Sequence, residues 1–277
     1  MALASPQPQD LALTIFGAHV RAPGELAWSG GMVELLAEFG FSTEAARAAL
    51  SRLATRRLIA RTKRGRQVFY RLTPRAKDLL EEGDARIFTF GDGAGGSDRW
   101  TVLWHSLPEA RRTERARLGR RLRFLGFGSV QDATWVAPHD REHEVVALLQ
   151  HLGVAEHAYV LVGRPTRALD VAAVVAEAWD LAAVSDAYDA FLAEFAPFRR
   201  RDGRNGPDDR EAFVVRTRAL HLFRGFPFLD PELPDELMPR PALRPKVVAT
   251  FQQLYADLQG PAARHFAAVA GAGVAAP

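Results

Sequence analysis

Basic side chains that could bind phosphate are concentrated between Ser42 and Lys77. This block holds 11 lysines and arginines against one acidic residue, Glu44, so its net charge is +10. The whole chain carries only +3, which leaves 25 basic and 32 acidic residues, a net of −7, for the rest of the sequence. Guanidinium and ammonium groups bind phosphate oxygens, and charge asymmetry of this kind is typical of proteins with a polyanionic partner. The first partner that the sequence predicts is therefore a nucleic acid.

A helix must position these side chains, and the stretch TEAARAALSRLAT (43–55) predicts one. Ser42 precedes it at the N-cap position, where a hydroxyl can accept a hydrogen bond from the first turn. At about 100° per residue, Ala46, Leu50 and Leu53 share one buried stripe. The opposite side mixes small polar residues with arginines, and this mixture lets a helix approach base edges and phosphates in the DNA major groove.

A basic β-hairpin is predicted directly after this helix, in the stretch LIARTKRGRQVFYRLT (58–73). Its first strand begins with apolar residues, and its second strand holds Val, Phe and Tyr in sequence. We expect the turn to lie over Lys63, Arg64 and Gly65. A hairpin with a basic tip is suited to contact phosphates or the minor groove.

The order of the predicted elements indicates a winged helix-turn-helix domain over residues 1–91. The remaining helices of this domain are expected at 11–22, 31–39 and 74–82. The basic helix would be the recognition helix, and the hairpin would be the wing. The residues expected to contact DNA are Ser42, Thr43, Arg47, Ser51, Arg52, Arg56, Lys63, Arg64 and Arg66. The alternative interpretation is a solvated basic surface without a partner.

Two further domains are predicted beyond the glycine-rich linker DGAGGSD (92–98). Residues 99–165 have the order β-α-β-β-α-β, which is typical of a ferredoxin-like fold. Residues 171–270 are almost wholly helical, apart from a proline-rich stretch (226–245) that cannot be a regular helix. The expected fold class is therefore α+β.

The chain resembles the phenylacetate-degradation repressor (PaaX) family of bacterial transcription regulators in segments that are spread over nearly its whole length. These segments are LTIFGAHVR (13–21), LSRL (50–53), RQVFYRLTPRA (66–76), WTVLWHSLPE (100–109), LRFLGFG (122–128), WVAP (135–138), AWDL (178–181), HLFRGFPFLDPELP (221–234) and LYADL (254–258). The resemblance implies a winged-helix domain, a ferredoxin-like dimerisation domain and a C-terminal helical domain that binds an acyl-CoA effector. It also implies a repressor of a catabolic operon that phenylacetyl-CoA releases. A homodimer of this kind suits a double-stranded DNA operator with an inverted repeat.

The C-terminal domain is where the effector is expected to bind. An aryl-CoA needs an apolar slot for its ring and cations for its phosphates. The candidates are Trp179, Arg216, His221 and Arg224, although an aromatic residue at helical spacing is more often part of a core. A regulator of the same fold with a different effector, or with none, is equally compatible with the sequence.

Three other features have alternative interpretations. The middle domain resembles small ferredoxin-fold nucleases, but the end of its first strand, HSLP (105–108), lacks the carboxylate that a catalytic metal ion needs. His139 and His143 have the i,i+4 spacing of helical zinc ligands, yet a solvated pair is the simpler interpretation. The seven arginines within 111–123 could extend a DNA footprint, dock an effector phosphate or form a solvated helix face.

Composition excludes several classes of protein. The chain has no cysteine, no G-x-S-x-G motif, no P-loop and no G-x-G-x-x-G motif, so we expect no catalytic residues, no metal site and no cofactor. It has neither a run of about 18 apolar residues nor the pattern of a signal peptide. The sequence therefore predicts a cytoplasmic binding protein rather than an enzyme or a membrane protein.

Overall fold

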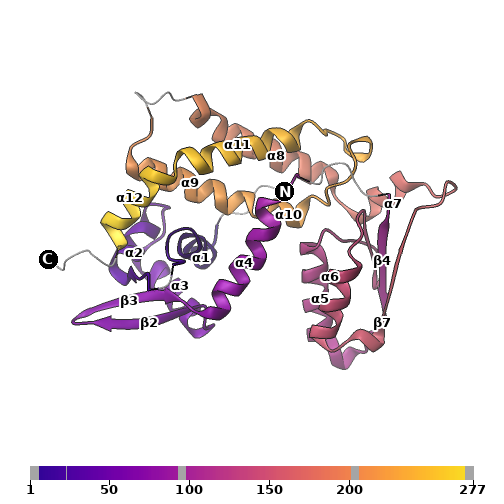
Figure 1. Ribbon diagram of the computed structural model, residues 1–277, viewed down its shortest axis with the longest axis horizontal. Coiled ribbons are helices and arrows are strands. Elements are labelled where there is room, and N and C mark those ends of the chain that lie inside the picture. The colour runs from indigo at the N-terminus through magenta and orange to yellow at the C-terminus, as the bar shows by residue number, and fades with distance from the viewer. Residues whose placement is uncertain (1–5, 23, 93–97, 201–205, 272–277) are drawn as a thin grey trace. The chain divides into compact units, whose positions relative to one another are not determined.

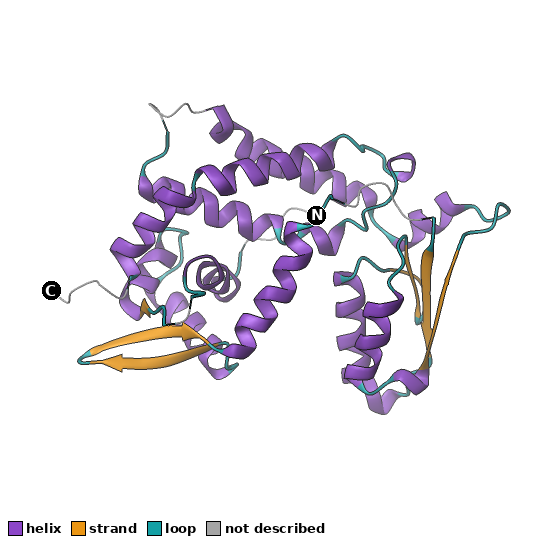
Figure 2. Ribbon diagram, viewed as in Figure 1, coloured by secondary structure: helices purple, strands orange, loops and turns teal. Residues whose placement is uncertain are grey.

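The computed structural model describes residues 6–22, 24–92, 98–200 and 206–271 (Figure 1). Its contacts divide the chain into two compact units, which are described in turn. The hairpin unit consists of residues 2–88, 190–224 and 247–277, and the sheet unit consists of residues 89–189 and 225–246. The fold is α+β, with helices and two antiparallel sheets (Figure 2).

The N-terminal part of the hairpin unit contains four helices and three strands. They are α1 (Pro8–His19), β1 (Ala27–Trp28), α2 (Ser29–Ala37), α3 (Thr43–Thr55), β2 (Ile59–Arg64), β3 (Gln67–Leu72) and α4 (Pro74–Phe88). The strand order is β1-β3-β2, and all pairs are antiparallel. The order of the four helices and the hairpin is the predicted one, while the two-residue strand β1 has no signal in the sequence.

Helix α3 forms where the sequence predicts it. The Ser42 hydroxyl accepts a hydrogen bond from the backbone N–H of Ala45 at 3.2 Å, which satisfies one of the free donors of the first turn. Ala46, Leu50 and Leu53 are all buried, as their helical spacing requires. The cap and the apolar stripe therefore fix both the beginning of the helix and the face that it turns to the core.

The hairpin turn is one residue later than predicted. Arg64 pairs with Gln67, so the turn residues are Gly65 and Arg66, and Lys63 and Arg64 belong to strand β2. Gly65 has φ = +60°, which is typical of the first central residue of a tight two-residue hairpin turn. The expected turn over Lys63, Arg64 and Gly65 was wrong because the strand signal is weak in a run of basic residues.

Helices from the C-terminal part of the chain complete the core of the hairpin unit. This part holds α9 (Asp209–Phe223), α12 (Gln259–Ala270) and most of α11 (Leu243–Asp257). Phe213 of α9 and Phe266 of α12 are buried in the same cluster as the apolar residues of α1, α2 and α3. Gly31 of α2 lies so close to α12 that an added Cβ would be 2.1 Å from the carbonyl oxygen of Val269.

The sheet unit has the element order β-α-β-β-α-β that the sequence predicts for residues 99–165. Its elements are β4 (Trp100–His105), α5 (Arg112–Phe124), β5 (Gly128–Gln131), β6 (Thr134–Ala137), α6 (Glu142–Leu152) and β7 (Ala158–Gly163). The strand order is β5-β6-β4-β7, and every pair is antiparallel. Leu118 and Leu122 of α5 and Val145 and Leu149 of α6 form one core with residues of the sheet, so both helices cover the same face.

The region after β7 is mainly helical. The predicted single or double helix after Val171 is two helices, α7 (Val171–Ala178) and α8 (Leu181–Phe195). The proline-rich stretch contains only the four-residue helix α10 (Phe226–Leu229) and a 3-10 turn before α11. The three-domain division stays a prediction, and most of the expected linker, residues 93–97, lies outside the described residues.

None of the described helices is long and apolar enough to span a bilayer.

Candidate nucleic-acid interface

The nine residues predicted to contact DNA are all exposed at the surface of the hairpin unit. Arg47, Ser51 and Arg52 lie on the side of α3 opposite its buried stripe. The Ser42 hydroxyl is engaged in the helix cap, so any DNA contact would have to share it. The side chain of Arg52 donates a hydrogen bond from Nε to Oε1 of Gln9 on α1 at 3.3 Å. This contact holds one guanidinium group against the neighbouring helix and leaves its other nitrogens free for a ligand.

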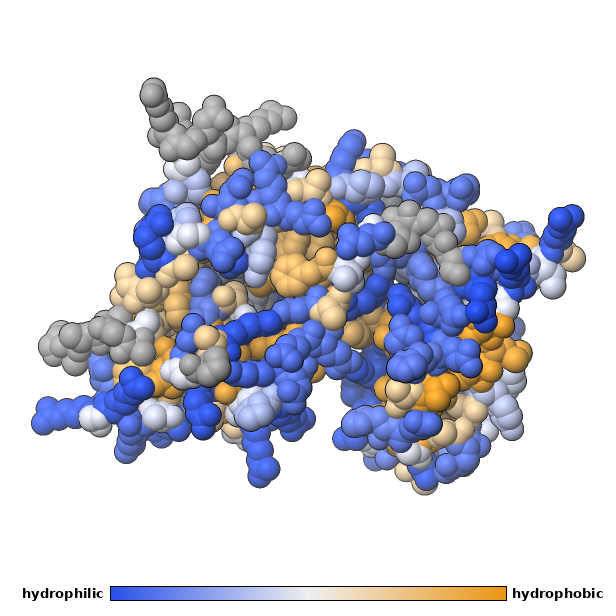
Figure 3. Space-filling view, viewed as in Figure 1, coloured by the Kyte–Doolittle hydropathy of each residue, from blue (hydrophilic) through white to orange (hydrophobic). Residues whose placement is uncertain are grey.

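Basic side chains also surround the tip of the β2–β3 hairpin. Lys63, Arg64 and Arg66 are exposed, and hydrophilic side chains project from the hairpin at the lower left of Figure 3. The guanidinium carbon of Arg64 lies 5.8 Å from the ring centroid of the buried Phe69, which anchors its stem. Helix α3 contacts β2, so the helix and the hairpin belong to one surface.

Among the described residues, no carboxylate lies within ion-pair distance of the arginines on α3 or of the basic residues on β2 and at the hairpin turn. Glu44 is the one acid in the block. The backbone N–H of Glu44 and the Ser42 hydroxyl lower the pKa of its carboxyl group, so it stays ionised at the positive end of the helix. The exposed face of α3 and the hairpin therefore present a positive potential to solvent.

Two of the four predicted effector residues, Arg216 and His221, lie on α9, and Arg224 is the C-cap residue of that helix. The structure brings His221 and Arg224 together. Arg224 donates a hydrogen bond from Nη1 to Oγ1 of Thr14 on α1 at 2.8 Å. Nδ1 of His221 lies 3.2 Å from the same hydroxyl oxygen. Arg216 is buried further along the helix, where its Nε donates to the carbonyl of Tyr255 at 2.9 Å and its guanidinium lies 3.7 Å from the Tyr255 ring centroid.

The guanidinium groups of Arg216 and Arg224 act on two partly buried histidines, His19 and His221. Burial lowers the pKa of His221 from 6.5 to about 4, and the charges of Arg224 and Arg218 act in the same direction. Burial and the charge of Arg216 likewise lower the pKa of His19 to about 4. Burial also lowers the pKa values of Arg216 and Arg224. His19 and Thr14 could not be selected from the sequence, because only the packing of α1 on α9 places them in this group.

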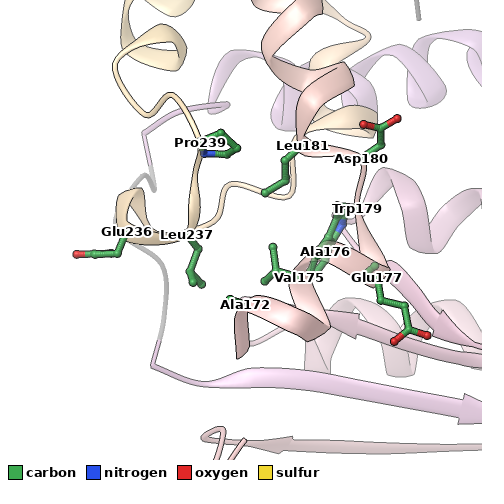
Figure 4. Close-up of a pocket in the computed structure, with 11 residues that line it drawn as sticks. Ala172, Val175, Ala176, Glu177, Trp179, Asp180, Leu181, Glu236, Leu237 and Pro239 are labelled. Atoms are coloured by element: carbon green, nitrogen blue, oxygen red, sulfur yellow. The ribbon is translucent and has the colours of Figure 1, made fainter. Parts of the chain in front are cut away.

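Trp179, the fourth predicted effector residue, lies in the sheet unit and not with the other three. It ends α7 and packs edge-on against Trp100, with ring centroids 6.4 Å apart. It also lines a cavity of about 620 Å³ between α7, the start of α8 and the segment around Leu237 (Figure 4). The charged residues of this lining are the acids Glu177, Asp180 and Glu236. An acidic lining repels phosphate groups, so this cavity suits an apolar group better than the phosphates of CoA.

The histidine pair considered for zinc does not have the required geometry. His139 precedes α6, and its Nε2 lies 3.0 Å from the carbonyl oxygen of Pro231. His143 is exposed on α6 itself. The pair therefore does not share a helix, and no group of three or more possible metal ligands occurs among the described residues.

His105, at the end of β4, has its pKa lowered mainly by burial and secondly by the charge of Arg115.

The fold and this surface define an α+β protein that exposes a basic helix followed by a basic hairpin. The chain belongs to the PaaX family, because three models of that family match successive parts of it. They are described as PaaX-like protein (residues 7–76), PaaX protein central Cas2-like domain (94–175) and PaaX-like protein C-terminal domain (179–268).

Two known proteins are similar over most of the chain. The transcriptional repressor PaaX of Escherichia coli is 26% identical over 235 residues, which are 83% of this chain and 73% of that protein. A solved structure of the uncharacterized protein Rv0674 from Mycobacterium tuberculosis covers 96% of this chain and 99% of its own, with a TM-score of 0.55 and 22% identity. The second likeness concerns the fold alone.

Proposed function

We propose that this protein is a DNA-binding transcriptional regulator that represses its target operon. The observation that carries this proposal is the exposed, unneutralised basic surface formed by α3 and the β2–β3 hairpin. In a winged helix-turn-helix, α3 enters the major groove and the hairpin contacts the sugar–phosphate backbone. Family membership and the name of the Escherichia coli relative support repression rather than activation.

The Arg47→Ala substitution tests this proposal. Arg47 is fully available on the exposed face of α3, so we expect a loss of about 1–3 kcal/mol, or roughly 10- to 100-fold, in affinity for a specific duplex. The duplex is the one that the wild-type chain enriches from a random-sequence pool, and fluorescence anisotropy measures its binding. The melting temperature should not change, because Arg47 makes no contact with the core.

The Lys63→Ala substitution at the hairpin is the matched control. A phosphate contact carries no sequence information, so this variant should weaken binding to specific and random duplexes alike. It should also reduce the slope of log affinity against log salt concentration by about one. Equal affinity of the wild type and Arg47→Ala for the specific duplex would contradict the assignment of α3 as the recognition helix.

A homodimer formed through the sheet unit is part of the same proposal. The strand order β5-β6-β4-β7 is that of a ferredoxin-like sheet, whose one face is covered by α5 and α6. The other face exposes Trp104, Tyr159 and Leu161, and a hydrophobic patch is visible at the position of β4 and β7 at the right of Figure 3. Trp104 and Tyr159 stack with their ring centroids 5.2 Å apart. A second copy of this face is the occupant that would bury it and place two recognition helices on an inverted repeat.

The Leu161→Arg substitution tests this dimer. Leu161 is 61% exposed at the centre of β7, so the change costs the monomer little, but it would bury two charges across the interface. We expect self-association to weaken by at least about 100-fold, measured as a shift from dimer to monomer by light scattering. Val146→Arg is the control, because Val146 is an exposed apolar residue of the same unit that lies on α6 and not on the sheet. A monomeric wild type, or an unchanged dimer in Leu161→Arg, would contradict the proposal.

An acyl-CoA thioester such as phenylacetyl-CoA is the proposed effector that releases the operator of a catabolic operon. The family resemblance and two arginines, the buried Arg216 and the partly buried Arg224, support an anionic ligand, since an anion would neutralise charge that burial makes costly. Trp179 belongs to the sheet unit and is a separate candidate for an apolar contact. The effector must bind the DNA-competent and the released arrangements with different affinities.

The test of this effector is release of the specific duplex by phenylacetyl-CoA at concentrations where free phenylacetate and free CoA have no effect.

A further inference from the structure

The seven arginines at the start of the sheet unit divide into two groups with different environments. Three have protein partners or are half-buried. Arg111 donates to the carbonyl of Gly153, Arg115 donates to the carbonyl of Leu107, and Arg121 lies over the Phe124 ring, where burial lowers its pKa. The four others, Arg112, Arg117, Arg120 and Arg123, are exposed. Ordinary packing therefore accounts for only part of this arginine-rich helix.

The four exposed arginines share one face of α5. At about 100° per residue, Arg123, Arg120 and Arg117 lie roughly 20°, 80° and 140° around the helix from Arg112. The small residues Thr113 and Ala116 fall between them, and both are exposed. Glu114, the one acid of the helix, lies outside this arc. The face therefore has the same composition as the exposed side of α3, with arginines separated by short side chains.

This face differs from an ordinary solvated helix surface. Such surfaces usually pair acids with bases at i,i+3 and i,i+4. Here Glu114 has that spacing to Arg117 but forms no ion pair with it among the described residues, and Arg117, Arg120 and Arg123 repel each other at intervals of three. Among the described residues, none forms an ion pair with Arg112, Arg117 or Arg120. The helix dipole favours Arg123 in the last turn, but it disfavours Arg112 in the first turn. The arrangement is thus unfavourable for the protein alone and is relieved by an external anion.

The size and rigidity of the face fit a nucleic-acid backbone. The span from Arg112 to Arg123 is about 17 Å at 1.5 Å per residue, and duplex DNA carries one charge per about 1.7 Å of its axis. The guanidinium of Arg123 rests 5.2 Å from the ring centroid of Trp135 and stays exposed, so one of the four groups is held in place by the core. Arginine forks bind phosphate oxygens in a bidentate manner.

We infer that Arg112, Arg117, Arg120 and Arg123 form a second DNA-backbone contact surface, on the sheet unit, in addition to the surface of α3 and the hairpin. This inference rests on the proposed DNA-binding function. It assigns no sequence preference to α5, because phosphate contacts position a protein on DNA without reading bases. Contacts of this kind raise the affinity for every duplex and make that affinity more dependent on salt concentration.

The test is a full-length variant with all four arginines replaced by glutamine. We measure its affinity for a long random-sequence duplex by anisotropy across about 50–200 mM KCl, where each phosphate contact contributes about 0.9 to the log–log slope. The slope should become shallower by about 3–4, and the preference for the specific over the random duplex should be retained. The control is Arg164→Gln/Arg167→Gln/Arg240→Gln, which removes exposed charge from the same unit outside α5 and should leave the slope nearly unchanged.

The outcomes separate this inference from the proposed function. If the quadruple variant keeps the wild-type slope, or if the control lowers the slope as much, the α5 surface is not a DNA contact. If the quadruple variant loses affinity for phenylacetyl-CoA while its DNA slope is unchanged, the anion at α5 belongs to CoA and the inference is overturned. If the wild type shows no salt dependence at all, the proposed function itself fails.

Discussion

The Asp230→Ala substitution is expected to destabilise the sheet unit by about 3–5 kcal/mol, because it leaves a buried arginine without its counter-ion. Asp230 and Arg244 are almost completely inaccessible to solvent. Nε of Arg244 donates to Oδ2 of Asp230 at 2.7 Å and Nη2 donates to Oδ1 at 3.0 Å, and the hydroxyl of Tyr188 donates to the same carboxylate. The backbone N–H of Glu232 donates a further hydrogen bond to it at 2.6 Å.

The environment of this pair explains the size of the effect. Burial, followed by the charge of Asp230, raises the pKa of the Tyr188 phenol well above its usual range, so the phenol remains a donor. Burial alone would lower the pKa of Arg244, but the hydrogen bond and charge of Asp230 outweigh it and raise the pKa. Without Asp230, Arg244 retains the carbonyl of Leu233 and the hydroxyl of Tyr188 as neutral partners, and neither of them balances its charge.

Urea unfolding of the full chain measures the loss. The control is Asp189→Ala, which breaks the exposed ion pair with Arg240 and should cost at most about 1 kcal/mol. Asp230→Ala/Arg244→Met should recover a large part of the stability, because it removes the uncompensated charge together with its partner. A loss in Asp230→Ala no larger than in the control would show that the buried pair does not hold this unit together.

Acidification from about pH 8 to about pH 5 is expected to destabilise the hairpin unit by roughly 4 kcal/mol through two buried histidines. His19 and His221 have pKa values lowered from 6.5 to about 4 in the folded state. Between these values the unfolded chain binds more protons than the folded chain. Stability therefore rises with pH in this window, and it falls as the pH drops from 6.5 towards 4. Each histidine contributes about 2 kcal/mol to the difference at pH 5.

The comparison that isolates this effect is between the wild type and His19→Gln/His221→Gln at both pH values. The variant loses packing at either pH, since His19 stacks on Phe266 with ring centroids 4.7 Å apart and His221 contacts Thr14. Its stability should nevertheless change much less with pH than that of the wild type. Equal pH dependence of the two proteins, measured by urea unfolding, would contradict the assignment of the acid sensitivity to these residues.

Features set by neighbouring residues could be predicted from the sequence. The limits of α3 follow from the Ser42 cap and the stripe of Ala46, Leu50 and Leu53, and both signals lie within a few turns of chain. The β-α-β-β-α-β order of the sheet unit follows in the same way from local periodicity. The exposure of the predicted DNA-contact residues is a consequence of that stripe, because the opposite face of a packed helix has to be solvated.

Features set by distant contacts could not be predicted. The buried state of Arg216 depends on α11, and the contacts of Arg224 and His221 depend on α1, more than 200 residues away along the chain. The bond between Asp230 and Arg244 joins two residues of a proline-rich stretch that carries no periodic signal. The separation of Trp179 from the other effector candidates arises because the C-terminal segment contributes to both units.

The contribution of α12 to the hairpin unit has a consequence during protein synthesis. Ala262, Phe266 and Ala270 belong to the same core cluster as the buried stripe of α3, and Gly271 pairs with Ala27 of β1. These residues leave the ribosome more than 200 residues after α3, so a nascent or prematurely terminated chain carries the basic helix without its support. Such a chain lacks the apolar contacts of α12, so we expect its N-terminal helices to be less stable than those of the full-length protein.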